Sequence, residues 1–270
     1  MKHRSLRQPL VIIGLLALTI AIVVTVSHGQ PQRPAQPAAP AISPKVAEIL
    51  QGTSNYLSSL NEFTVHGEAT HDVVLPSGEH LAMNHAIDVA VQRPNHMRVE
   101  FTSPNNNRVA YYNGRTVTLY TPKTNTYGVV STPSTIAETL PWLERRYGIA
   151  LPIADLLAPD PYVTLTGKVT SGRLVGASLI NGVYTNQLAF RQPDVDWQLW
   201  VEDSKTPFPR RLVILDKTQK GTPQYMMTFT RWDTSPAFPA NYFTFTPPAG
   251  AQIIKVMEMP QTPRQGRTAR

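Results

Sequence analysis

Two neighbouring stretches of the chain alternate strictly between apolar and polar side chains, and this pattern restricts the fold more than any other feature. In FTVHGEATHDVVL, residues 63–75, the odd positions form one face and the even positions form a polar face. In EHLAMNHAIDVAV, residues 79–91, the odd positions again carry the apolar side chains. Such alternation predicts antiparallel strands with one buried face and one wet face, and the PSG between them predicts a turn.

Further runs of the same kind predict more strands. MRVEF, RVAYY and TVTLY come before residue 135, and KVTSGRLVGASLI, VYTNQLAFR, WQLWVED, RRLVILD and YMMTFTRW follow later, while ANYFTFTPPAGAQII predicts a last strand. Asn113-Gly114 and Asn181-Gly182 predict two-residue hairpin turns. An antiparallel sheet of this many strands must curl or close.

Helical patterns occur before the first strand and in the middle of the chain. Ser43 as a cap and Pro44 at the first helical position predict an amphipathic helix in SPKVAEILQGTSNYLSSL. Thr135 and Glu138 form a capping box, but Pro141 interrupts the pattern, which predicts two short helices that meet there. LPIADLLAPD predicts a third short helix.

The N-terminus has the composition of an export segment. The basic leader MKHRSLRQP precedes 17 residues without a charge, Leu10–Val26. This combination predicts export, and the length fits both a cleaved signal peptide and a membrane anchor. We therefore expect residues 1–29 to be the signal peptide or anchor, 30–42 a proline/alanine linker, 43–259 one domain and 260–270 a disordered tail.

The charge distribution argues against nucleic-acid binding. The formal charge is +7, but the basic excess lies in the two tails, because residues 41–254 contain 17 basic and 17 acidic side chains. A neutral central part offers no obvious stripe for a phosphate backbone. The sequence has no cysteine, which excludes disulfides, thiolate metal sites, cysteine catalysis and a lipidated N-terminal cysteine.

Asp194 and Asp196 lie one residue apart beside two tryptophans in AFRQPDVDWQLWVED. Two carboxylates this close are compatible with a metal site or an acid/base pair. In a strand, however, Val195 and Trp197 share the apolar face, so both aspartates fall on the wet face. No matching further ligand and no nucleophile motif accompany them. We interpret the stretch as a turn and the start of a strand, and we expect no catalytic residue, metal or cofactor.

Five of the seven histidines lie between His66 and His96. The register places His66 and His80 on the wet face and His71 and His85 on the apolar face, where these two become cross-strand or diagonal neighbours. Two histidines are too few for a closed metal site. The pair is compatible with a polar spot on the inner wall or with ordinary core histidines.

Methionines also gather on the predicted strands, at Met83, Met97, Met226 and Met227. Their soft side chains suit a surface that accepts variable apolar ligands. A plain hydrophobic core is the commoner meaning of such residues, and the sequence leaves both interpretations open.

Several longer phrases resemble one family of bacterial proteins. AFRQPDVDWQLWVED…PFPRRLVI and PAFPANYFTFTPPAGA are similar to the predicted periplasmic proteins catalogued as domain of unknown function 2092, as are YNGRTVTLYTP, RYGIALPIADLLAPDP and VTSGRLVG. The resemblance covers about residues 43–251. Family members often carry a cysteine and a histidine where this chain has Thr185-Asn186-Gln187, which places a shared polar role there in doubt.

This family in turn resembles the lipoprotein-carrier fold of LolA, LolB and the sensor domain of RseB. The resemblance implies an α+β fold, in which a curved antiparallel sheet forms an open half-barrel with an N-terminal helix and mid-chain lid helices. It also implies a concave apolar cavity that holds acyl chains. Fold similarity alone does not give activity.

We therefore expect an exported, non-enzymatic protein of the Gram-negative periplasm that binds a lipid, an acyl chain or another hydrophobic ligand in the half-barrel, with lipid or lipoprotein carriage as one role. The alternative is a protein-interaction or sensor module of the RseB type with an envelope protein partner. The N-terminal segment would contact the membrane, and we expect no nucleic acid and no cofactor. The predicted cavity wall consists of Phe63, Val65, His71, Val73, Leu81, Met83, His85, Ile87, Val89, Val91, Phe101, Trp142 and Leu143.

Overall fold

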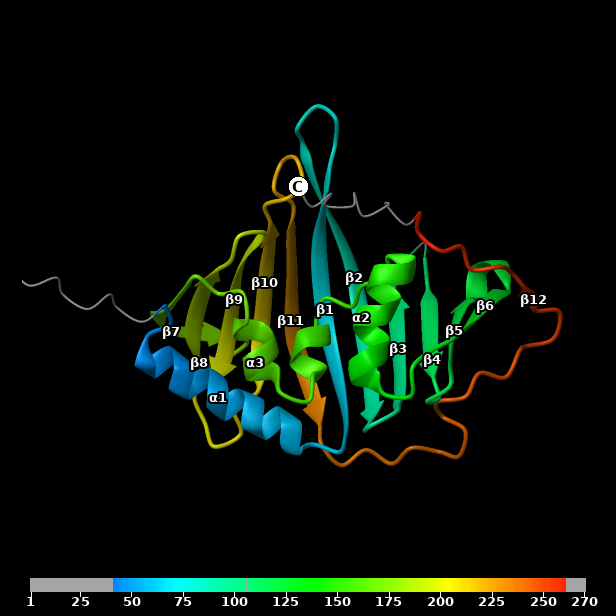
Figure 1. Ribbon diagram of the computed structural model, residues 1–270, viewed down its shortest axis with the longest axis horizontal. Coiled ribbons are helices and arrows are strands. Elements are labelled where there is room, and N and C mark those ends of the chain that lie inside the picture. The colour runs from blue at the N-terminus through cyan, green and yellow to red at the C-terminus, as the bar shows by residue number, and fades with distance from the viewer. Residues whose placement is uncertain (1–40, 105, 261–270) are drawn as a thin grey trace, which may run out of the picture. The chain divides into compact units, whose positions relative to one another are not determined.

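The computed structural model describes residues 41–104 and 106–260 (Figure 1). The expected export segment, all but the last two residues of the expected linker, and the tail from residue 261 lie outside the described residues. Within the described ranges, no helix is both long enough and apolar enough to cross a membrane.

One sheet of 12 strands dominates the described part of the chain, in the order β12-β6-β5-β4-β3-β2-β1-β11-β10-β9-β8-β7. The strands are β1 Glu62–Val74, β2 His80–Gln92, β3 His96–Thr102, β4 Arg108–Tyr112, β5 Thr116–Thr121, β6 Thr126–Ser131, β7 Ser171–Ile180, β8 Val183–Arg191, β9 Val195–Glu202, β10 Pro209–Asp216, β11 Gln224–Asp233 and β12 Gln252–Ile253. All neighbours are antiparallel except β12 and β6, and β7 and β12 do not pair, so the sheet stays open.

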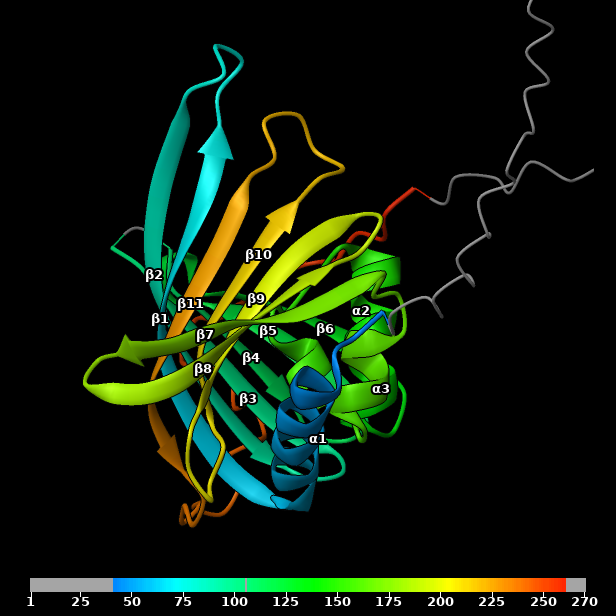
Figure 2. The same cartoon turned by 90° about the vertical axis from the view of Figure 1, so that its left-hand side faces the viewer.

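The helices lie on one face of this curved sheet, which is called the inner face below (Figure 2). They are α1 Pro44–Ser59, α2 Ile136–Tyr147 and α3 Pro161–Thr166, with 3-10 turns η1 Pro122–Thr124 and η2 Ala154–Leu157. The expected architecture is therefore confirmed: a curved, open antiparallel sheet with an N-terminal helix and mid-chain helices on its inner face.

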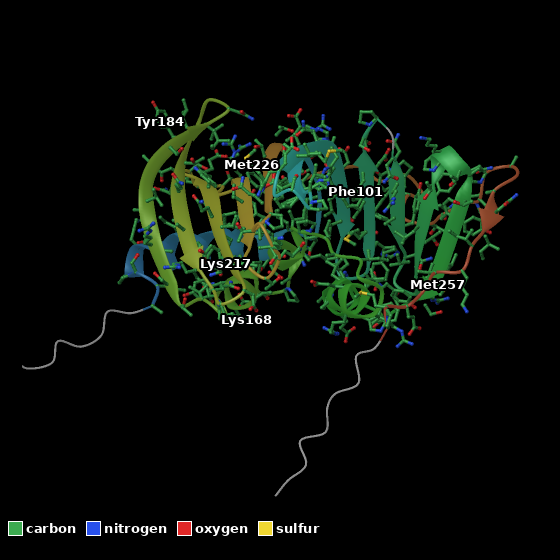
Figure 3. All side chains as sticks on the ribbon, turned by 90° about the horizontal axis from the view of Figure 1, so that it is seen from above. Phe101, Lys168, Tyr184, Lys217, Met226 and Met257 are labelled. Atoms are coloured by element: carbon green, nitrogen blue, oxygen red, sulfur yellow. The ribbon has the colours of Figure 1, made fainter. Side chains whose placement is uncertain are left out.

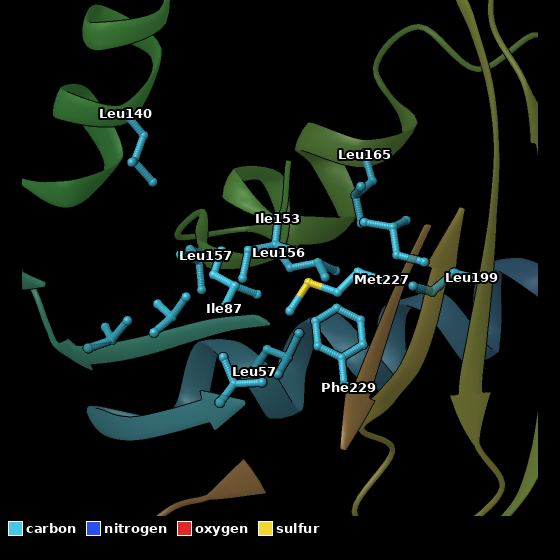
Figure 4. Packing of buried hydrophobic residues seen from close by; sticks show 14 of the residues in the cluster. Leu57, Ile87, Leu140, Ile153, Leu156, Leu157, Leu165, Leu199, Met227 and Phe229 are labelled. Carbon is cyan, nitrogen blue, oxygen red and sulfur yellow. The ribbon is translucent and has the colours of Figure 1, made fainter. Parts of the chain in front are cut away.

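The hydrophobic core fills the space between these helices and the inner face. Side chains from η2 and α3, such as Leu156, Leu157 and Leu165, meet Ile87 and Phe229 of the central strands (Figure 4). Each fully buried aliphatic or aromatic side chain contributes about 1.5–3 kcal/mol. The odd positions of β1 and β2 face this core because side chains alternate along a strand.

The prediction of two short helices meeting at Pro141 is wrong, because α2 is continuous and contains Pro141 in its interior. Pro141 is exposed, and its missing N–H leaves one carbonyl of the helix without its usual donor. Leu140 and Leu143 bury the opposite side against the sheet. The N-cap half of the capping box is confirmed, since Thr135 Oγ1 accepts from the Glu138 N–H at 3.3 Å, while the Glu138 carboxylate accepts from the Thr135 hydroxyl at 2.9 Å.

The prediction of a strand in ANYFTFTPPAGAQII is also wrong for most of that stretch. Within it, only Gln252–Ile253 forms a strand, which pairs parallel to β6. Prolines lack the donor that a ladder needs. Instead, Phe245 packs on tyrosines of β4, β5 and β6 at ring distances of 5.0–5.5 Å. Strand β6 was not predicted. Its Gly128 admits the crossing C-terminal segment, since a Cβ there would lie 2.4 Å from a methyl of Val256.

One of the two predicted hairpin turns has the expected length. Ile180 pairs with Val183, and both Asn181 and Gly182 have positive φ, at 49° and 80°. This is the conformation that a two-residue hairpin turn requires. The other turn is longer than predicted, because the last pair before it joins Tyr112 to Val117 and the Asn113 side chain accepts two backbone N–H groups.

Candidate functional site

Asp194 and Asp196 are a turn residue and a strand residue, as predicted. Asp194 is exposed, and its carbonyl accepts from the Lys217 N–H at 2.9 Å where β9 meets the end of β10. Asp196 lies on the outer face and forms an ion pair with Lys217 Nζ at 2.7 Å. Among the described residues, no group of three or more His, Asp and Glu side chains could hold a metal ion.

Converting both aspartates to asparagine is therefore expected to cost less than about 1 kcal/mol each, because partly exposed ion pairs contribute little. Chemical denaturation of the Asp194→Asn/Asp196→Asn protein measures this cost. Any metal bound by the native chain and lost in the variant, detected by elemental analysis, would show that the carboxylates have a chemical role after all.

The predicted cavity wall divides into a buried part and an open part. Six of its residues are buried: Phe63, Val65, Ile87, Val89 and Val91 on the strands, and Leu143 on α2. Towards the tip of the β1–β2 hairpin the wall is open, and Val73, Leu81 and Met83 are 41%, 39% and 47% exposed. His71 is exposed, while His85, Phe101 and Trp142 are half-buried between the two parts.

An apolar pocket of about 60 Å³ lies between α2 and the inner face of β3, β4 and β5. Its lining contains no charged side chain and consists of Met97, Val99, Phe101, Ala110, Tyr112, Val117, Leu119, Leu140, Leu143, Ile149, Ala150 and Leu151. Phe101 and Leu143 are the two members of the predicted wall that line it. The remaining strand residues of the lining could have been predicted as inward-facing from the alternation in MRVEF, RVAYY and TVTLY.

The pocket exists because a short side chain lies where its neighbours are large. Ala110 pairs with Val99 on one side and Leu119 on the other, and its small size leaves space beneath α2. The segment that leads into α2 is fixed, because the Tyr112 hydroxyl donates to the Pro133 carbonyl at 2.9 Å. Burial raises the pKa of this phenol, so it remains a donor at every relevant pH.

A C-terminal strap, residues 252–259, fixes the other end of α2. It pairs with the β6 edge, and the Met259 N–H then donates to the Arg146 carbonyl at 2.8 Å. The guanidinium of Arg146 forms an ion pair with Glu258 at 2.8 Å. The pocket of about 60 Å³ is small beside sites for drug-sized ligands, which measure about 300–1,000 Å³. A ligand of lipid size therefore requires α2 to move.

Four aromatic rings form a cluster beside the pocket, called the imidazole cluster below: His71, His85, Phe101 and Tyr225. The two imidazole centroids are 5.4 Å apart, and that of His85 lies 6.1 Å from Phe101 and 6.3 Å from Tyr225. His71 pairs with Met83 and with Tyr225, and His85 pairs with Ala69, so the histidines are diagonal neighbours as predicted. Phe101 belongs both to the cluster and to the pocket lining.

The cluster disfavours charge in the ligand-free protein. Burial lowers the pKa of His85, and the neighbouring His71 lowers it further. Burial raises the pKa of Tyr225 far above its usual range, and within the described ranges its hydroxyl donates only to the thioether of Met227, at 3.7 Å. Both side chains are therefore neutral at pH 7.

This pKa shift of His85 makes stability depend on pH. Because the folded-state pKa of His85 is lower than the unfolded value of about 6.5, the unfolded chain binds more protons as the pH falls through that value. The free energy of unfolding should therefore decrease from pH 7.5 to pH 5.5. Denaturation of His85→Phe across this range should show a smaller decrease, and an equal decrease in both proteins would assign the effect to other groups.

The outer face carries a larger hollow, of about 150 Å³, but four of the ionisable side chains that line it are paired with one another. His66 pairs with Asp88 at 2.6 Å, and Arg98 pairs with Glu100 at 2.7 Å and also donates to the Tyr242 hydroxyl at 3.0 Å. These contacts join neighbouring strands and stabilise the sheet. The apolar pocket with the adjacent imidazole cluster is therefore the stronger candidate site.

Comparison with known proteins shows a match over most of the chain. A family model described as "Predicted periplasmic protein (DUF2092)" matches residues 46–257. A search of curated proteins gave no match.

Three solved structures have a similar fold at low sequence identity. The Mycobacterium tuberculosis lipoprotein LppX is 12% identical, with 72% of this chain and 97% of LppX covered and a TM-score of 0.44. A LolA superfamily protein from Nitrosomonas europaea is 16% identical, with 74% and 97% covered and a TM-score of 0.37. A chain of the Pseudomonas aeruginosa MucA/MucB complex is 15% identical, with 75% and 61% covered and a TM-score of 0.40. These likenesses concern the fold alone.

Proposed function

Because the chain belongs to the family of predicted periplasmic proteins (DUF2092), we propose that it is an exported, non-enzymatic protein that holds a lipid or another hydrophobic ligand on the inner face of its sheet. The observation that carries this proposal is the apolar pocket beneath α2, whose lining offers aliphatic and aromatic side chains and no charge. Such a lining favours an acyl chain, because an acyl chain can bury its apolar surface against these side chains.

The open part of the inner wall supports the same function. Val73, Leu81 and Met83 continue the inner face beyond the helices, and they remain substantially exposed on one side of the β1–β2 hairpin. Adjacent exposed apolar side chains are typical of a ligand groove or an interaction site. A chain entering from this end would pass the imidazole cluster before reaching the pocket.

In this proposal, α2 moves away from the sheet and so enlarges the pocket enough for a ligand of lipid size. Few polar contacts fix the helix at its ends: the Ile136 N–H donates to Pro94, and Arg146 contacts the strap through Met259 and Glu258. Gly148, with φ of 67°, ends the helix and begins the connection to η2. Solvent screens an exposed ion pair, which then contributes little to stability, so binding of an acyl chain can offset the loss of the Arg146–Glu258 pair.

Titration of lipid-free protein with cis-parinaric acid, a fluorescent fatty acid, tests this function. The expected result is saturable fluorescence with one site per chain and displacement by unlabelled fatty acid. A linear increase without saturation would contradict the proposal, because it would indicate surface partition alone.

A second candidate function is docking of an envelope protein partner, and one surface favours it. The hairpin of β7 and β8 exposes Leu174, Val175, Leu179 and Tyr184, the last to 74%. Tyr184 lies at the β7 end of the sheet, far from Met257 at the other end (Figure 3). If docking is the function, protein purified from membranes should carry a protein partner without a bound lipid, and Tyr184→Ser should release that partner.

A further inference from the structure

The four histidines of the β1–β2 hairpin divide into two kinds. On the outer face, His66 pairs with Asp88 at 2.6 Å and His80 pairs with Asp72 at 3.0 Å. On the inner face, neither His71 nor His85 forms a hydrogen bond or ion pair with any residue that the structure describes. His85 therefore keeps free ring nitrogens in a half-buried place, where polar groups usually have partners, and His71 lies beside it at the exposed edge.

These free nitrogens lie at the border of the apolar pocket. His85 contacts Phe101, which lines the pocket, and it contacts Tyr225, whose hydroxyl has only a weak thioether acceptor. Polar donors placed at one end of an apolar pocket are what a site for an amphiphile requires, because the pocket takes the chain while the donors fix the head group.

The charges around the pair favour an anion over a cation. On the inner face, Phe101 pairs with Arg108, an exposed cation whose guanidinium donates to the Asn106 side-chain oxygen at 3.1 Å. The nearby carboxylate of Asp72 points to the outer face, where it accepts from His80 and from the Gln224 N–H. Asp72 interacts electrostatically with His71, but its carboxylate is already paired with His80, and no described carboxylate forms an ion pair with either inner imidazole.

From this arrangement we infer that His71 and His85 bind the anionic head group of the acyl ligand, with the chain directed past Phe101 into the pocket beneath α2. The inference rests on the function proposed above and assigns the chemistry of the ligand: an anionic amphiphile, such as a fatty acid or an alkyl phosphate. A bound anion favours the charged form of a neighbouring imidazole, which burial and mutual repulsion disfavour in the empty protein.

This assignment predicts a characteristic pH dependence. Binding of the carboxylate laurate should strengthen as the pH falls from 8 to 6, because the complex takes up a proton on the imidazole pair. An alkyl phosphate takes up its own second proton at about pH 6, so laurate is the ligand for this comparison. An opposite charge at contact distance shifts a pKa by about 1–3 units, so the gain is expected to reach about tenfold. Tyr225 stays neutral over this range, so it does not alter the direction of the effect.

Competition against the neutral fluorescent probe 1-aminoanthracene measures the head-group preference directly. Laurate, dodecyl phosphate and dodecanol share one chain and differ in head group, while acetate and inorganic phosphate supply the anion without a chain. In the native protein, the two charged amphiphiles should displace the probe at lower concentration than dodecanol at pH 6. The ratio of the concentrations at which laurate and dodecyl phosphate displace half of the probe identifies the preferred head group.

The variants His71→Phe and His85→Phe keep an aromatic ring and remove the ring nitrogens. They should weaken laurate or dodecyl phosphate binding about tenfold, abolish the pH dependence and leave dodecanol binding unchanged. His80→Phe, on the outer face, is the matched control and should change none of these values.

Three results would overturn the inference. If the two variants lose affinity equally for charged and for neutral amphiphiles, the histidines belong only to the apolar wall. Unchanged laurate and dodecyl phosphate binding in both variants would exclude the pair as the head-group site. Binding of acetate or inorganic phosphate as strong as that of the amphiphiles would assign a free-anion site. Failure of every amphiphile in the native protein would instead reject the proposed function itself.

Discussion

Replacing Ile87 with lysine is expected to lower the free energy of unfolding by about 3–5 kcal/mol, which is enough to unfold many domains of this size. Ile87 is 0% exposed, and it meets side chains from η2 and α3 at the centre of the core (Figure 4). An ammonium group placed there would have no partner and no water. Thermal and chemical denaturation followed by circular dichroism would measure the loss.

Met83→Lys is the matched control for this change, because Met83 lies on the same face of β2 only four residues away. Met83 is 47% exposed, so a long charged side chain can reach water there, and the cost should stay within about 0.5 kcal/mol. If both lysines destabilise the protein equally, the division of the inner wall into a covered and an open part is wrong.

Ala110→Trp is expected to abolish binding of the fluorescent fatty acid. The pocket of about 60 Å³ exists because Ala110 is short, and an indole projecting from this position would occupy the space beneath α2. The affinity should fall at least about tenfold, which corresponds to about 1.4 kcal/mol. Ligand titration, with a parallel denaturation curve to confirm folding, measures this effect.

Overpacking costs about 1–3 kcal/mol, so the smaller Ala110→Leu change provides a second variant that is easier to accommodate. Ala82→Trp places the same indole on the outer face of β2, where the side chain is exposed, and should leave binding intact. Unchanged fatty-acid affinity in Ala110→Trp would exclude the pocket beneath α2 as the binding site.

The sequence was sufficient to predict the architecture because the inner and outer faces follow directly from period-two alternation. The odd positions of 63–75 and 79–91 do face the core side, and the diagonal contact of His71 with His85 follows from the hairpin register. Local turn chemistry was similarly informative at Asn181-Gly182, where two successive positive φ angles are needed.

Features that depend on tertiary packing were not visible in the sequence. Pro141 predicted a helix break, but burial of Leu140 and Leu143 against the sheet stabilises one continuous helix. Strand β6 escaped notice because Gly128 weakens its pattern, and the reason for that glycine is the approach of Val256 from the far end of the chain.

The binding site was only partly predictable for the same reason. Alternation indicated which side chains face inwards, but not where the helices cover them, so Phe63, Val65 and Val89 entered the predicted wall although they lie in the closed core. Ala110 gave no signal in the sequence, since its importance comes from being shorter than Val99 and Leu119 beside it.

Native mass spectrometry of the full-length protein, purified from the cell envelope in mild detergent, tests the central claim most directly. The account predicts one acyl lipid per chain, which dissociates on collisional activation and is absent from Ala110→Trp purified in parallel. A native chain that carries no lipid, or an Ala110→Trp chain that carries the same lipid in the same amount, would contradict it.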